Sequence, residues 1–130
     1  MTETIKQYAT PEMAAKVQEL VEICHQANIG WWVDIHTGMP KPRNHGELIA
    51  LIHSELSEAL EADRKNLMDD KLTHRHGLEV ELADALIRIF DMAGGLGLDI
   101  GGAMVEKLVF NAQRADHKRE NRIADGGKKY

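Results

Sequence analysis

Two segments decide the fold: residues 52–60 read IHSELSEAL, and residues 79–91 read EVELADALIRIFD. Each has the apolar spacing of a helix and carries two acidic residues three positions apart. Residues three apart lie side by side on a helix, with Cβ atoms roughly 5–6 Å apart. Each segment can therefore present two carboxylates in one direction.

The four acids are Glu55 and Glu58 in the first segment and Glu81 and Asp84 in the second. If the two helices pack face to face, the four carboxylates converge. Two unit charges about 4 Å apart repel by about 4 kcal/mol at an effective dielectric near 20, so such a cluster needs cations. Carboxylates without a paired cysteine or histidine suit Mg²⁺, or Mn²⁺, better than zinc. The alternative is that both pairs lie on solvated helix faces.

Composition limits the class of protein. The chain has 130 residues, enough for one domain with its own core, and its net charge of -5 argues against coating a nucleic acid polymer. Cys24 is the only cysteine, which favours a reducing compartment. The first residues lack the apolar core of a signal peptide, and no apolar run reaches the ~18 residues that a membrane span needs. We expect a cytoplasmic protein with no membrane partner.

The pattern predicts an all-α fold, a four-helix bundle in one domain covering residues 1–130. Prolines occur only at positions 11, 40 and 42, and strand-like alternation is absent. Thr10, Asn44 and Asp99 are typical helix caps. We expect a loosely held N-terminus (1–9), a basic tail (117–130), and helices at about 10–28, 44–65, 77–94 and 99–115, the third ended by Gly94, Gly95 and Gly97.

The apolar positions also predict which faces are buried. The second helix should bury Leu48, Ile52, Leu56, Ala59 and Leu60. The third is apolar on most sides, so other helices should surround it. Its one polar stripe, formed by Glu81, Asp84, Arg88 and Asp91, should then face inward.

The connection at residues 30–46 is long for a compact domain, and long loops are often functional. It holds both tryptophans, Trp31 and Trp32. Either they anchor the loop on the core, or they form a stacking surface for a nucleobase. The sequence leaves both interpretations open.

A di-iron bundle also uses helical glutamates, but it needs two Glu-x-x-His motifs, and only Glu22–His25 has that spacing. Another family fits better. The ordered motifs E55xxE58, E81LADALIRxxD91 and K107xxxN111xxR114, followed by G127KK, resemble the MazG-like all-α nucleoside triphosphate pyrophosphohydrolases over residues 30–130. Ser54 departs from the family, which often has a glutamate there. Residues 114–117 are similar to viral members, which implies the host cytoplasm.

The resemblance implies hydrolysis of a (deoxy)nucleoside triphosphate to the monophosphate and pyrophosphate, with purine dNTPs such as dGTP as preferred substrates. Glu55, Glu58, Glu81 and Asp84 would bind two or three Mg²⁺ ions, and Glu55 or Glu58 would orient the attacking water. The substrate's phosphates would contact Lys107, Asn111, Arg114 and Lys128. A homodimer or homotetramer would complete the fold.

Two other functions remain open. The chain could be a non-catalytic helical interaction module whose acids face solvent. It could also be a nucleotide-binding sensor that keeps the metal site without turnover.

Overall fold

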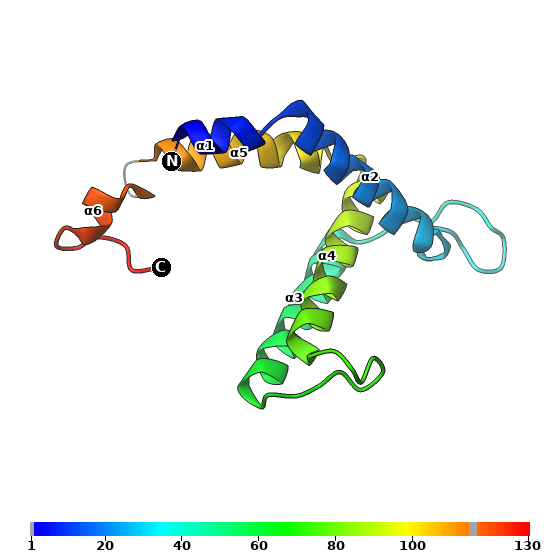
Figure 1. Cartoon of the computed structure of the whole chain (residues 1–130). Helices are drawn as coiled ribbons and strands as arrows, with labels where there is room; N and C mark the ends of the chain where they lie inside the picture. The colour runs from blue at the N-terminus through cyan, green and yellow to red at the C-terminus, as the bar shows by residue number, and fades with distance from the viewer. Residues whose placement is uncertain (1, 115–116) are drawn as a thin grey trace. The chain divides into compact units, whose positions relative to one another are not determined.

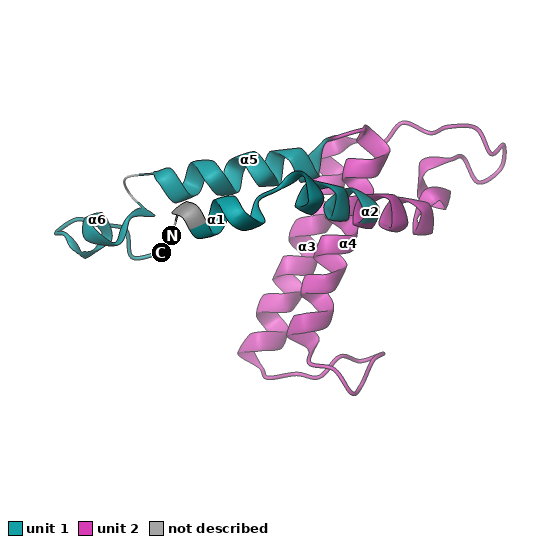
Figure 2. Ribbon diagram, turned by 45° about the horizontal axis from the view of Figure 1, so that its top comes forward, with its two compact units in different colours: residues 1–19, 99–130 teal, residues 20–98 magenta. Residues whose placement is uncertain are grey.

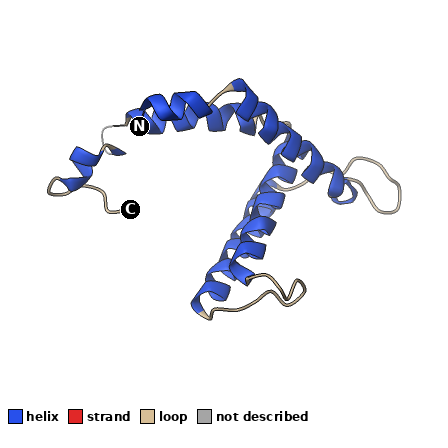
Figure 3. Cartoon of the chain, in the orientation of Figure 1, coloured by secondary structure: helices blue, strands red, loops and turns tan. Residues whose placement is uncertain are grey.

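The computed structural model describes residues 2–114 and 117–130, and within these it is helical, with no strand (Figure 3). Two isolated antiparallel β-bridges, Val33–Pro40 and Met68–His76, lie in the loops on either side of α3 (His45–Arg64). The all-α prediction is therefore confirmed. None of the described helices combines the length and the apolar character that crossing a membrane requires.

The chain divides into two compact units, coloured separately in Figure 2. One consists of Met1–Glu19 with Asp99–Tyr130, and the other is Leu20–Leu98. The boundary falls within α2 (Pro11–Ala27). We describe each unit by itself.

The centre of the second unit is a hairpin of α3 and α4 (Gly77–Leu96), which run side by side (Figure 1). As predicted, Asn44 caps α3: its side chain accepts a hydrogen bond from the Glu47 backbone N–H at 3.0 Å. α4 ends at Gly97, whose φ of 68° is the left-handed conformation that glycine adopts most easily.

Gly94 and Gly95 do not end α4, contrary to the prediction; both lie inside it. They are there because other side chains approach the helix closely. A Cβ at Gly94 would lie 2.6 Å from the Cβ of His25, and one at Gly95 would overlap the six-membered ring of Trp32. His25 of α2 and Trp32 of the short 3-10 helix η1 (Ile29–Trp32) thus pack against the last turn of α4.

Gly95→Ala should lower the free energy of unfolding by about 1–3 kcal/mol. The added methyl group must displace the Trp32 ring, and this costs more free energy than the higher helix propensity of alanine contributes. Urea denaturation measures the change. Gly30→Ala is the matched control: its Cβ meets nothing within 4 Å, so we expect a change within about 0.5 kcal/mol. Equal effects of the two substitutions would contradict the packing described for Gly95.

Both helices of the hairpin carry buried alanines. Ala59, Ala62 and Ala85 are buried, and such small side chains let two helices approach closely. Leu48 is buried as predicted, but Leu56 and Leu60 are 46% and 59% exposed, contrary to the prediction. α4 likewise leaves a stripe of leucines exposed, consisting of Leu78, Leu82 and Leu86. The apolar faces that the sequence marks as core are therefore partly uncovered in the chain by itself.

The other unit contains α1 (Thr2–Tyr8), α5 (Ile100–Gln113) and α6 (Arg119–Ile123). α1 packs along α5. As predicted, Asp99 caps α5 by accepting a hydrogen bond from the Gly102 N–H at 3.0 Å. The N-terminus (1–9), which we expected to be loosely held, contains α1, and the predicted basic tail (117–130) contains α6. The predicted end of α5 at Ala115 lies outside the described residues.

Candidate metal centre and adjoining pocket

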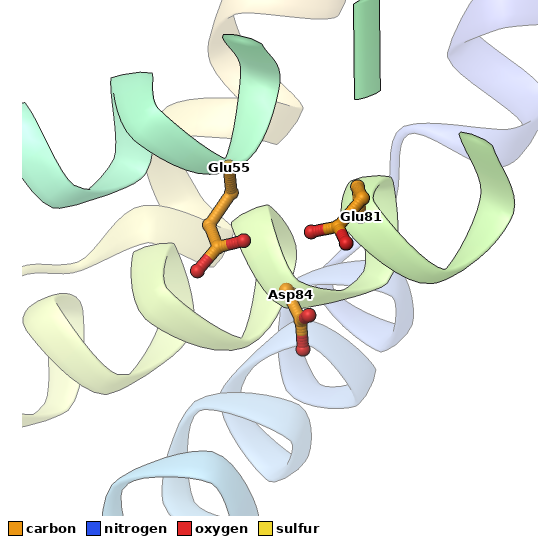
Figure 4. Close-up of side chains that lie close together, drawn as sticks. All are labelled: Glu55, Glu81 and Asp84. Carbon is orange, nitrogen blue, oxygen red and sulfur yellow. The ribbon is translucent and has the colours of Figure 1, made fainter. Parts of the chain in front are cut away.

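Three of the four predicted acids come together. Glu55 lies on α3, and Glu81 and Asp84 lie one turn apart on α4 (Figure 4). Each is half-buried, and one oxygen from each lies within 4.8 Å of the others. Among the described residues, no other set of three or more acidic, histidine or cysteine side chains is arranged this closely for one ion.

Arg88 holds the Glu55 side of this cluster. Its Nε donates a hydrogen bond to Glu55 Oε1 at 2.9 Å, from the turn of α4 that follows Asp84. The predicted polar stripe thus faces α3 at these positions. One guanidinium cannot balance three carboxylates, so the cluster keeps an excess of negative charge.

Glu58 is exposed, one turn beyond Glu55, and does not belong to the three-residue cluster. It is still close enough for its charge to help raise the pKa values of Glu81 and Asp84. The structure therefore separates the predicted quartet into three clustered acids and one acid at the edge.

Burial, together with the interactions with Glu55 and Glu58, raises the pKa of Glu81 to about 8. Burial also raises the pKa of Asp84, as does the charge of Glu55, while Arg88 opposes the shift. Glu81 Oε2 is buried and has no hydrogen-bond donor among the described residues; its neighbours are carboxylates, which donate only when protonated. The cluster must therefore take up either a proton or a cation.

These donors fit Mg²⁺ or Mn²⁺. All three are carboxylate oxygens, the ligand type that hard divalent ions prefer, and a metal bound there would satisfy the unpartnered Glu81 oxygen. Three side-chain ligands would leave positions for water or for substrate oxygens.

The predicted phosphate-binding residues belong to the other unit. Lys107 Nζ lies 4.8 Å from the centroid of the Phe110 ring. Asn111 Oδ1 is buried without a hydrogen-bond partner among the described residues, and Arg114, half-buried, follows the end of α5. Asn111 and Lys128 line one pocket of about 830 Å³; the side chains that surround this pocket do not include Lys107 or Arg114.

The structure gives the two tryptophans different roles. Trp32 is half-buried, its Nε1 donates to Asp91 Oδ1 at 2.9 Å, and its ring packs on Gly95, so it anchors the loop. Trp31 is 68% exposed and lines a pocket of about 510 Å³. Of the two interpretations, anchoring is confirmed for Trp32, and stacking stays a prediction for Trp31.

This pocket adjoins the acid cluster through Arg88, which lines the pocket and also binds Glu55. Three of its lining residues had no predicted role as site residues: Lys41, Arg43 and Asp91. Asp91 could have been found, since it continues the polar stripe of α4 one turn after Arg88. Lys41 and Arg43 lie in an irregular loop, where spacing carries no such signal.

No family model, no curated protein and no solved structure matches this chain.

Proposed function

We propose that the chain is a Mg²⁺-dependent pyrophosphohydrolase of (deoxy)nucleoside triphosphates, acting in the cytoplasm. The main support is the cluster of Glu55, Glu81 and Asp84, in which Glu81 Oε2 is buried and has no hydrogen-bond donor among the described residues. The resemblance of the ordered acid motifs and of the Lys107–Arg114 element to MazG-like enzymes supports the same reaction.

In this proposal Glu55, Glu81 and Asp84 hold the ions, with Glu58 contributing from the edge of the cluster. When bound, Mg²⁺ would neutralise phosphate oxygens and lower the pKa of a coordinated water. Glu58 is exposed and close to the cluster, so it can orient the water and accept its proton. The water oxygen bonds to the α-phosphorus, the bond to the bridging oxygen breaks, and pyrophosphate leaves. The resemblance assigns Lys107, Arg114 and Lys128 to neutralising the leaving pyrophosphate and Asn111 to donating to it.

The test is incubation with each of the eight common (d)NTPs and Mg²⁺, followed by chromatography. We expect nucleoside monophosphate and pyrophosphate, and loss of both products with EDTA or in Glu58→Gln. Glu61→Gln is the matched control, because Glu61 lies one turn further along α3 and pairs on the surface with Lys65. Diphosphate with orthophosphate would contradict the proposal, and tight binding without product would identify a nucleotide sensor instead.

We also propose that the chain forms a homodimer or homotetramer. The exposed leucines of α3 and α4, Leu56, Leu60, Leu78, Leu82 and Leu86, support self-association, because uncovered apolar stripes of this kind mark interfaces. The same stripe favours the second candidate function, a helical interaction module without activity. Light scattering after size exclusion gives the oligomeric state, and the nucleotide assay separates the two functions.

A further inference from the structure

The pocket of about 830 Å³ in the unit that contains α5 and α6 is strongly basic. Of the described residues that line it, only Glu120 is acidic, while four are lysine or arginine: Lys118, Arg119, Arg122 and Lys128. The whole chain has a net charge of -5, so this positive excess is a local feature. A pocket lined mainly by charges of one sign attracts ligands of the opposite sign.

The end of the chain folds back on itself to line this pocket. Residues 119–130 form a hook, in which α6 is followed by a turn and a returning tail (Figure 1). The Arg122 side chain closes the hook. Its Nε donates a hydrogen bond to the backbone carbonyl oxygen of Lys128 at 3.3 Å, and its Nη2 donates to that of Lys129 at 3.1 Å. Arg122 thus fixes the backbone of the segment that carries Lys128.

The turn of the hook requires glycine at two positions. Gly126 has a φ of 78°, the left-handed conformation that glycine adopts most easily. The Gly127 N–H donates to the carbonyl oxygen of Ala124 at 2.9 Å. A Cβ at Gly127 would overlap the backbone carbonyl oxygens of Asn121 and Arg122. Replacing Gly127 by alanine should therefore open the hook without changing any charge.

Asn111 adds an unpaired polar group to the pocket. It lies on α5, and its Oδ1 is buried without a hydrogen-bond partner among the described residues. A buried acceptor without a donor is costly. A protonated phosphate oxygen, or a sugar hydroxyl, would supply the donor that this oxygen lacks.

We propose that the hook makes this pocket a site for a polyphosphate anion, which lysine and arginine bind directly and without a metal ion. Several cations around one pocket match a ligand with several negative charges, and charge-assisted hydrogen bonds to phosphate are strong. Arg122 and Gly127 are positioning residues, because they hold Lys128 at the pocket. The inference rests on the proposed function only for the natural ligand, the polyphosphate of a nucleotide.

Calorimetry with inorganic tripolyphosphate in EDTA tests the site in the absence of metal. Without a cation the carboxylates of Glu55, Glu81 and Asp84 repel this probe, so they do not contribute to its binding. We expect the wild-type protein to bind tripolyphosphate with a Kd of about 0.1 mM or tighter. A wild-type protein that shows no binding at about 1 mM tripolyphosphate would overturn the proposal.

Three substitutions separate the positioning role from the loss of a charge. Lys128→Gln should weaken tripolyphosphate binding about 10-fold, the effect of losing one charge-assisted contact. Gly127→Ala should weaken it by a similar factor although it removes no charge, and combining the two should add less than twofold to Lys128→Gln alone. Lys129→Gln is the matched control: it removes a neighbouring charge whose side chain does not line the pocket, so we expect a change within threefold.

Hydrogen exchange reports the hook itself. The Gly127 amide should be protected in the wild-type protein and lose this protection in Arg122→Gln, which should also bind tripolyphosphate at least 10-fold more weakly. Gly127→Ala or Arg122→Gln proteins that bind tripolyphosphate like wild type would overturn the proposal, even if nucleotides are hydrolysed. If no nucleotide is hydrolysed but these variants lose tripolyphosphate binding, the proposed reaction fails and the anion site stands.

Discussion

Glu81→Gln is expected to abolish hydrolysis and, at the same time, to stabilise the metal-free protein. Loss of a ligand from the acid cluster should lower kcat/KM by at least ~10²-fold. In EDTA at pH 8 the free energy of unfolding should rise by about 1–3 kcal/mol. The unfolded carboxyl loses its proton near its ordinary pKa of 4.5, whereas the folded one keeps it to about 8. Folding at pH 8 therefore carries a cost, up to ~1.4 kcal/mol for each unit of separation before solvent screening, and glutamine removes it.

The measurements are steady-state assays with Mg²⁺ and urea denaturation with EDTA. Glu79→Gln is the matched control: Glu79 lies on α4 two residues earlier, is exposed, and pairs with Arg75 at 3.6 Å. It should change activity by less than twofold and stability by less than about 0.5 kcal/mol. A Glu81→Gln protein that stays active, or that is less stable than wild type in EDTA at pH 8, would contradict the role given to Glu81.

The affinity for Mg²⁺ should rise steeply with pH up to about 8. Between pH 5 and 8 the folded protein binds more protons at Glu81 than the unfolded chain does, so metal-free stability falls as pH rises through this range. Mg²⁺ must displace that proton, because its ligands are ionised carboxylates. With one proton released, the apparent affinity should improve about tenfold per pH unit well below the pKa of Glu81, and about 50-fold from pH 6 to pH 8.

Thermal shifts at several Mg²⁺ concentrations give this affinity at each pH, and calorimetry in two buffers of different ionisation enthalpy counts the released protons. Glu81→Gln should flatten the dependence over this range. A magnesium effect of equal size at pH 6 and pH 8, with no proton released, would show that the ion binds elsewhere.

The starts of α3 and α5 were predicted correctly because contacts within a few residues determine them. Asn44 and Asp99 cap their helices through side-chain contacts three residues away, and such contacts can be read from the sequence. The clustering of Glu55 with Glu81 and Asp84 follows from helical spacing together with the pairing of α3 and α4. Only that pairing had to be assumed.

Other predictions were wrong because their causes are not local. Gly95 lies inside α4 because Trp32, 63 positions earlier in the sequence, packs on it. Leu56 and Leu60 have the periodicity of core residues, but periodicity identifies an apolar face without identifying its partner. Asp91 is buried, as expected for the inward-facing stripe, but its contacts with His25 and Trp32 could not be predicted from spacing within α4.

The most direct test is a crystal structure of the protein grown with Mn²⁺ and recorded at the manganese absorption edge. We predict an anomalous peak within about 2.0–2.4 Å of carboxylate oxygens from Glu55, Glu81 and Asp84. Manganese bound elsewhere in the crystal, with these three carboxylates free of metal at millimolar Mn²⁺ and pH 8, would contradict it.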